Sequence, residues 1–177
     1  MFVACIRETS AYSINNYVVY SDDNGETWNV SGRASVGGDE SKVVELNNGD
    51  ILMSIRTHGK RWYNISHDGG ETWNETHYVW DDLYGPACNG DLIRYDENTL
   101  LHSLPSGDSR RDVAIYISND EGKTWNDGKI VVPRYSAYSS LCVLPDKTIG
   151  LYVEEREVDT TSYEMVFYRF PISYLRD

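Results

Sequence analysis

One eight-residue stretch sets the architecture of this chain: it runs Ser21-Asp22-Asp23-Asn24-Gly25-Glu26-Thr27-Trp28. The same pattern, S-x-D-x-G-x-T-W, returns at residues 66–73 and again at residues 118–125. The copies begin 45 and 52 residues apart, a spacing typical of a structural unit that repeats along a chain. Five identical positions in each of three copies therefore indicate an array of equivalent units.

A second repeat, in which two apolar runs flank a tight polar turn, lies between these copies. The turns are residues 47–49, 96–98 and 145–147, and each begins 49 residues after the one before. Apolar and β-branched runs bounded by Asn, Gly, Asp and Pro predict β-hairpins, and no segment predicts a helix. The predicted strands are residues 17–20, 43–46, 50–55, 62–65, 77–80, 92–95, 99–101, 113–117, 129–132, 141–144 and 148–151.

Four strands in about 49 residues predict the blade of a β-propeller. The repeated octapeptide suits the turn between the third and fourth strands of a blade. Its Asp can accept backbone N–H bonds, its Gly can take a positive φ, and its Trp can cover the hairpin. We therefore expect a structural role for this turn, and no acid catalysis by its aspartates, which are Asp22 or Asp23, Asp68 and Asp120.

The number of blades is smaller than a closed propeller needs. Residues 41–80 and 91–132 each supply four predicted strands, whereas residues 1–30 and 139–171 supply about three each. The total lies between three and four blades, and closed propellers have at least four. The prediction is an all-β chain in which residues 1–177 form a single, partial propeller domain of four-stranded antiparallel blades. We expect missing sequence or another chain to complete it.

Composition excludes several classes of function. The net charge of −12 argues against nucleic acid as a partner, because phosphate binding depends on clustered Lys and Arg. Residues 1–6 and the short apolar runs predict neither a signal peptide nor a membrane span, so cellular location stays open. Cys5, Cys88 and Cys142 lack a C-x-x-C pair and predict buried free thiols. With four dispersed histidines, no metal site or organic cofactor is predicted.

Further motifs lie between the repeated octapeptides. The first is D-E-S-x-V-V-E-L-x-x-G at residues 39–49, and Ile55-Arg56 follows at the end of the next predicted strand. The first resembles the N-E-S-x-V-V-E-L-x-x-G segment of sialidases (exo-α-neuraminidases). That family has a six-bladed propeller whose repeated turn is called the Asp-box, and the resemblance to its C-terminal half covers nearly the whole chain. The resemblance implies that Glu40 is the general base and that Arg56 belongs to an arginine triad that holds the substrate carboxylate.

Two later segments resemble family loops that touch the substrate. Residues 85–90, G-P-A-C-N-G, are similar to a loop with a substrate-contacting polar residue, which nominates Asn89; an ordinary polar loop is the alternative. Residues 109–112, S-R-R-D, stand where the family has another triad arginine. Counting back eight residues from Ser118 of the third box selects Arg110, with Arg111 as the fallback.

Two final segments complete the family order. Residues 136–141, S-A-Y-S-S-L, resemble the A-Y-S-x-L stretch that bears the catalytic tyrosine, so the resemblance assigns Tyr138 as nucleophile. Residues 149–154, I-G-L-Y-V-E, resemble the segment whose glutamate steadies the first arginine of the triad. Glu154 fits that count, and Glu155 adjoins it.

The implied chemistry suits these residue types. Sialic acid has a carboxylate on its anomeric carbon, which planar guanidinium groups bind through paired, charge-assisted hydrogen bonds. That carboxylate would repel a carboxylate nucleophile, whereas a neutral tyrosine avoids the repulsion. Phenols keep their proton at neutral pH, so the tyrosine needs an adjacent base, the role implied for Glu40 beside Tyr138.

Two family elements have no counterpart in this sequence. The first triad arginine stands in an F/Y-R-I-P segment, which Ile6-Arg7-Glu8 does not match, and the general-acid aspartate belongs to the other half of the domain. The leading hypothesis is a fragment of a sialidase that acts on sialylated glycoproteins, glycolipids or oligosaccharides. The alternatives are a non-catalytic propeller module that binds sialic acid or serves as a scaffold, and an Asp-box protein with no sialic-acid role.

Overall fold

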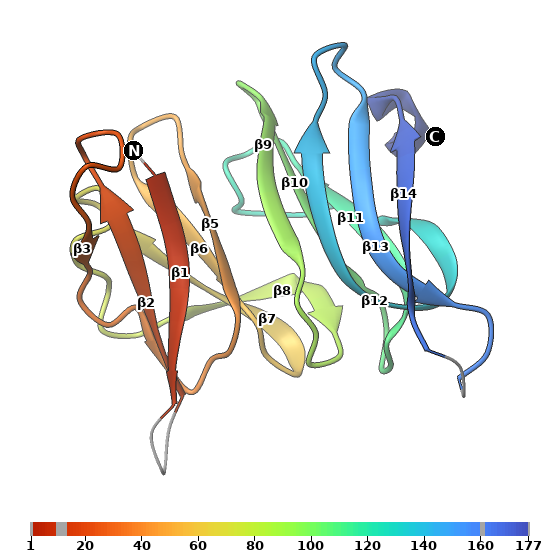
Figure 1. The fold of residues 1–177 in the computed structure, drawn as a ribbon, viewed down its shortest axis with the longest axis horizontal. Helices are drawn as coiled ribbons and strands as arrows, with labels where there is room; N and C mark the ends of the chain where they lie inside the picture. Colours follow the sequence, from red (N-terminus) through yellow and green to blue (C-terminus); the bar gives the residue numbers. More distant parts are fainter. Residues whose placement is uncertain (1, 10–13, 160–161, 177) are drawn as a thin grey trace. The chain divides into compact units, whose positions relative to one another are not determined.

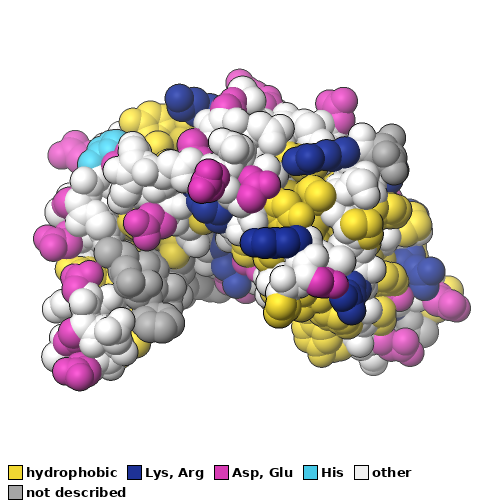
Figure 2. All heavy atoms as spheres, turned by 90° about the horizontal axis from the view of Figure 1, so that it is seen from above, with side chains coloured by type: hydrophobic (Ala, Val, Ile, Leu, Met, Phe, Trp, Pro, Cys, Tyr) yellow, Lys and Arg dark blue, Asp and Glu magenta, His cyan; other side chains and the backbone are white. Residues whose placement is uncertain are grey.

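The computed structural model describes residues 2–9, 14–159 and 162–176 of the chain. These residues contain fourteen β-strands and one 3₁₀-helix, Ile172–Leu175. The chain divides into two compact units, Met1–Thr57 with Arg61–Trp80 in the first and His58–Lys60 with Asp81–Asp177 in the second. Asp and Glu side chains are spread widely over the face shown in Figure 2, in keeping with the net charge of −12. No helix in the described residues is long and apolar enough to span a bilayer.

Two antiparallel sheets make up the first unit (Figure 1). One contains β1 (Phe2–Thr9), β2 (Ile14–Ser21) and β3 (Asn29–Val30) in that order, with β4 (Ser35–Val36) paired to the start of β2. The other contains β5 (Ser41–Glu45), β6 (Ile51–Ile55), β7 (Gly59–Ser66) and β8 (Tyr78–Gly85) in chain order, and β8 continues into the second unit. Their shared core consists of Val18, Tyr20, Ala34, Met53 and Ile55.

Six consecutive antiparallel strands form the sheet of the second unit (Figure 1). They are β9 (Asp91–Asp96), β10 (Thr99–Pro105), β11 (Arg111–Ser118), β12 (Lys129–Val143), β13 (Ile149–Arg156) and β14 (Glu164–Phe170). Strand β12 is 15 residues long and serves two blades: its first half pairs with β11 and its second half with β13. A four-stranded blade therefore passes directly into a three-stranded one. A core that includes Leu101, Ile115, Leu151 and Val153 joins the two.

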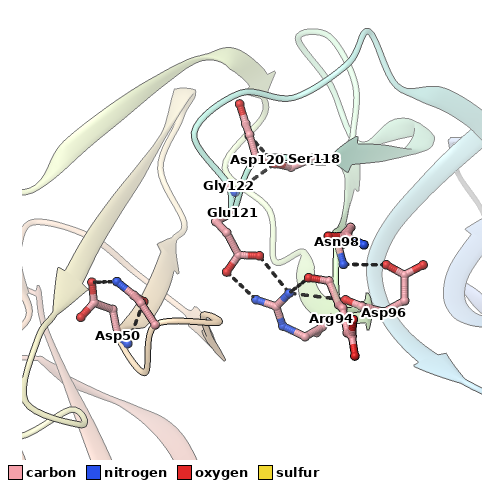
Figure 3. Close-up of polar contacts among 10 residues, drawn as sticks. Asp50, Arg94, Asp96, Asn98, Ser118, Asp120, Glu121 and Gly122 are labelled. Carbon is pink, nitrogen blue, oxygen red and sulfur yellow. Dashed lines mark hydrogen bonds and ion pairs between the residues drawn. The ribbon is translucent and has the colours of Figure 1, made fainter.

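The three octapeptides form the same hydrogen-bonded turn, which Figure 3 shows for Ser118, Asp120 and Gly122. The serine hydroxyl accepts the glycine N–H, at 2.9 Å from Gly122 N, and donates to the aspartate. The aspartate in turn accepts both the N–H and the hydroxyl of the threonine, at 2.9 and 2.6 Å from Thr124. In the first box these bonds come from Thr27 and Ser21 and lower the pKa of Asp23 to about 2.

In the β5–β8, β9–β12 and β12–β14 blades, a polar contact joins the hairpin turn, or the strand before it, to a residue later in the same blade. Asp50 lies 2.9 Å from His67 Nδ1, and Asp146 pairs with Arg169. In the blade between them, Arg94 donates to both carboxylate oxygens of Glu121, at 3.0 and 2.8 Å (Figure 3). Glu121 has a φ of +63°, a left-handed conformation that costs a non-glycine residue about 1 kcal/mol.

The structure confirms the all-β, partial propeller expected from the sequence, and each predicted strand overlaps an observed one. Three details differ. The predicted strands at 129–132 and 141–144 are one continuous strand, β12. The box tryptophans are not equivalent, since Trp28 is 50% exposed and Trp125 only 6%. Cys88 is buried as expected. Cys142 is exposed, because its side chain lies beside Gly150 and Phe167 on the uncovered face of the β12–β14 blade. Cys5 lies where side chains are not described.

Candidate functional site

Glu40 and Arg56 face each other where β5 begins and β6 ends. The backbone ladder continues past both strands, with Arg56 N 2.9 Å from Glu40 O and Asp39 N 3.0 Å from Arg56 O. This register places the side chains together, and Arg56 Nη1 donates to Glu40 Oε2. The Arg56 side chain is 13% exposed and that of Glu40 is 34% exposed. A largely desolvated guanidinium group is thus paired with a more accessible carboxylate.

Polar side chains that the sequence did not nominate hold this corner of the first unit. Asn16 is fully buried, and its amide donates to Asp39 O and, at 2.8 Å, to Ser41 Oγ. Its carbonyl oxygen accepts the Ser35 hydroxyl at 2.5 Å. The residues on both sides of Glu40 are therefore anchored to β2. The available signal was a pair of asparagines directly before the predicted strand 17–20, since a buried amide needs partners.

Tyr138 lies in a β-bulge between β12 and β13. The strand register shifts between Ser136 and Ser139, so Ala137 and Tyr138 have no ladder partners there. Tyr138 N donates to Glu154 Oε2 at 3.3 Å. A bulge redirects the side chain that it contains, and bulges are common beside active sites.

Arg110 and Glu154 approach Tyr138, whereas the residues next to them in sequence do not. The Arg110 guanidinium carbon is 5.3 Å from the centroid of the Tyr138 ring. Arg111 instead pairs with Asp112 at 3.0 Å and lies over Tyr135. Of the two candidate arginines, the second unit therefore brings Arg110 to the nominated tyrosine.

The same distinction separates the two candidate glutamates. Glu155 is 7% exposed, accepts the Tyr168 hydroxyl at 2.6 Å and pairs with Arg134 at 3.4 Å. Burial, followed by the nearby Glu155 carboxylate, raises the pKa of Tyr168. Glu155 thus belongs to a buried network on the other side of β13, and Glu154 is the glutamate on the Tyr138 side.

Asn89 lies in the loop that leads into β9 and has no described contact with Tyr138. Its side-chain oxygen is buried and has no hydrogen-bond partner among the described residues. The same loop is held to the site by Arg110, whose Nη2 donates to Ala87 O at 3.1 Å. Asn89 is therefore close in sequence to Ala87, which contacts Arg110, but it lies outside the group around Tyr138.

The six nominated residues divide between the two units. Glu40 and Arg56 are in the first, and Asn89, Arg110, Tyr138 and Glu154 are in the second. Antiparallel four-stranded blades with Asp-box turns define the class of the chain as a partial β-propeller of the repeat type found in sialidases.

Comparison with known proteins gives the family. A family model described as a BNR repeat-like domain matches residues 1–151, and the chain belongs to this family. A sialidase of Micromonospora viridifaciens is 35% identical over 149 residues, which cover 77% of this chain and 23% of that protein. A sialidase of Vibrio cholerae is 25% identical over 201 residues, covering 93% and 25%. The chain thus spans about a quarter of the length of these relatives.

A solved structure supports the same fold. The Trypanosoma rangeli sialidase in complex with 2,3-difluorosialic acid, described as a covalent intermediate, superposes with a TM-score of 0.76 at 24% identity. The match covers 94% of this chain and 28% of that one. The family model, the two similar sialidases and this fold together confirm the expected resemblance to the sialidase-type BNR propellers.

Proposed function

We propose that this chain carries the nucleophile side of a retaining exo-α-sialidase site, which cleaves terminal sialic acids from glycoproteins, glycolipids or oligosaccharides. The observation that carries the proposal is the grouping of Arg110, Tyr138 and Glu154 in the second unit of a chain whose curated relatives are sialidases. Glu40 and Arg56, paired in the first unit, are proposed to supply the base and a second arginine.

Tyr138 is the proposed nucleophile and Glu40 its base. The phenol oxygen forms a bond to the anomeric carbon while the bond from that carbon to the leaving-group oxygen breaks, and the phenol proton passes to the Glu40 carboxylate. Water then cleaves the tyrosyl–sugar bond, so that the configuration is retained. The Trypanosoma rangeli sialidase, whose complex is described as a covalent intermediate, supports a mechanism of this kind.

Arg56 and Arg110 are proposed to hold the carboxylate of the sugar. Their guanidinium groups are partly or largely buried, and charge-assisted bonds are stronger where water is excluded. Glu154 is proposed to steady the first arginine of the triad. Asn89 is proposed to contact the sugar from its loop.

The residues assigned here include neither that first arginine nor the acid that protonates the leaving oxygen. We propose that further propeller blades, from the same polypeptide or another chain, supply them and pack on the open face of the β12–β14 blade. In the preceding blade, the Leu101 side chain packs against the β12–β14 blade. Gly150 occupies the equivalent position of the repeat in the β12–β14 blade, so its side of the sheet is the one on which a following blade would pack. On that side Tyr152 and Phe167 remain 47% and 53% exposed.

A non-catalytic module that binds sialic acid is the second candidate. The observation that favours it is the ion pair between Glu40 and Arg56. A carboxylate paired with an arginine accepts a proton less readily than a general base should, but it can still form part of a binding site. The two candidates differ in whether a covalent bond to Tyr138 forms.

A trapping experiment separates the two candidates. The chain, alone and combined with a polypeptide that carries the remaining blades, is incubated with 2,3-difluorosialic acid and digested for mass spectrometry. We expect the label on the peptide that contains Tyr138 in the completed protein. Tyr138→Phe should abolish the label and lower turnover of a fluorogenic sialoside at least about 100-fold, whereas the control Tyr78→Phe, at a half-exposed tyrosine of β8, should change neither.

Two outcomes would contradict the enzymatic proposal. One is sialoside binding without label or turnover in either form, which identifies the binding module. The other is unchanged binding and turnover in Arg56→Ala and Arg110→Ala, which removes the proposed carboxylate clamp.

A further inference from the structure

We infer that Asp91 is a positioning residue for Tyr138, because its buried carboxylate fixes the strand segment that follows the Tyr138 bulge. This inference rests on the proposed function, in which Tyr138 is the nucleophile. Asp91 is the first residue of β9 and is 6% exposed. A buried carboxylate is costly to desolvate, so its hydrogen bonds determine what it contributes.

The Asp91 carboxylate connects two strands that are not neighbours in the sheet. Its Oδ2 accepts Leu141 N at 2.7 Å and the Ser140 hydroxyl at 3.1 Å, and its Oδ1 accepts Leu92 N at 3.0 Å. In the sheet order, β9 and β12 are separated by β10 and β11. The contact with residues 140 and 141 therefore comes from this side chain and not from the backbone ladder.

A second link joins the same two strands through a pair of buried serines. Asp91 N donates to Ser103 Oγ at 3.2 Å, and Ser103 Oγ is 2.8 Å from Ser139 Oγ. Ser103 is fully buried and Ser139 is 5% exposed. Residues 139, 140 and 141 are consequently all held from the start of β9.

The upstream end of the bulge is fixed from β11. Ser136 is fully buried, its hydroxyl accepts Val113 N at 3.0 Å, and its own N–H donates to Arg110 O at 3.1 Å. Only Ala137 and Tyr138 stand between the two anchored ends. Tyr138 N donates to Glu154 inside the bulge, and Asp91 and Ser136 anchor the strand on either side of it, so these contacts together restrict the backbone that carries the Tyr138 side chain.

Losing the Asp91 carboxylate should therefore affect chemistry more than substrate binding. Removing the carboxylate takes away the acceptor of the buried Leu141 N and the side-chain anchor downstream of the bulge, while the pairing of residues 139–143 with β13 remains. A nucleophile misplaced by about 1 Å costs on the order of 100-fold in rate, while a substrate held by arginines elsewhere keeps its affinity.

The experiment measures kcat and KM in the completed, active protein for Asp91→Ala, Asp91→Asn and Asp96→Asn. We expect Asp91→Ala to lower kcat about 10- to 100-fold with KM changed less than about twofold. Asp91→Asn keeps one acceptor oxygen and should restore part of the loss. Asp96→Asn removes an exposed carboxylate at the other end of the same strand and should leave both constants unchanged.

Labelling by 2,3-difluorosialic acid gives an independent readout, since its rate should fall in step with kcat in Asp91→Ala. If Asp91→Ala does not fold, Asp91→Asn and Ser139→Ala are measured instead, and each should lower kcat without a matching rise in KM. An unchanged kcat in these folded variants, or equal changes in kcat and KM, would overturn the inference. The proposed function fails separately, if Tyr138→Phe retains activity.

Discussion

At the scale of single residues, the Glu40–Arg56 ion pair couples the proposed base to the proposed clamp. Arg56 donates to Glu40 in the structure, and the proposed mechanism gives both groups other partners. In that mechanism a sugar carboxylate that binds Arg56 competes with Glu40 for the guanidinium group. Substrate binding would then release the proposed base from its ion pair.

This coupling predicts opposite effects of one substitution on binding and on turnover. In Glu40→Gln the amide competes less well for Arg56, so free sialic acid should bind about 2- to 5-fold more tightly, while turnover should fall at least about 100-fold. Calorimetry measures the first and the fluorogenic assay the second. Glu45→Gln, in the same strand, is the control that should change neither. Weaker binding in Glu40→Gln would show that the pair does not restrain Arg56.

The sequence nominated these residues to within one position, and the structure shows which member of each neighbouring pair lies near Tyr138. Spacing nominated Arg110 beside Arg111 and Glu154 beside Glu155, but successive side chains in a strand point to opposite faces, so a count that is off by one selects the wrong face. The only sequence signal for Asn16 was its place in a pair of asparagines before a predicted strand, and Asp91 carried none. Their partners, Ser41 and Leu141, are 25 and 50 residues away in sequence, and only folding brings them together.

At the scale of elements, the Asp-box is the best predicted feature because its interactions are local. Every bond in the turn joins residues two to four positions apart, so the octapeptide alone contains the information. Strand β12 was less predictable. The sequence predicted separate strands at 129–132 and 141–144, yet Tyr135 pairs with both β11 and β13 and keeps the segment between them extended.

The box aspartates predict an acid-sensitive component of stability. Threonine and serine hydrogen bonds lower the pKa of Asp23 from 3.8 to about 2. Between these values the unfolded chain binds a proton that the folded chain does not, so the stabilisation is complete above about pH 4 and is lost as the pH falls to about 2. Urea unfolding should show Asp23→Asn less stable than the wild type at pH 7, with a difference that narrows toward pH 2.

The control for this prediction is in the same turn. Asp22→Asn removes an exposed carboxylate next to the box aspartate and should produce no comparable pH-dependent difference. A stability difference for Asp23→Asn that stays constant from pH 7 to pH 2 would contradict the role assigned to these hydrogen bonds.

At the scale of the whole molecule, the repeat explains why one face of the last blade is apolar. Leu101 of the preceding blade is fully buried against β12–β14, whereas Tyr152, Met165 and Phe167 of the last blade are 47%, 49% and 53% exposed. A blade face of this kind is built to be covered. The chain also spans only about a quarter of the length of its sialidase relatives. Its assignment as one partial domain stays a prediction, because the structure divides into two compact units.

The open face predicts that the isolated chain associates with itself through β12–β14. Burying one phenylalanine contributes about 1.5 to 3 kcal/mol, so Phe167→Lys should weaken association about tenfold or more in Kd, as measured by sedimentation velocity over a range of concentrations. Ile130→Lys, which changes an equally apolar side chain that is 46% exposed elsewhere on β12, should leave association unchanged. Equal effects of the two substitutions would mean that general hydrophobicity, and not this blade face, drives association. The same Phe167→Lys chain should also fail to gain activity when the remaining blades are supplied, because they would pack on the face that the lysine disrupts.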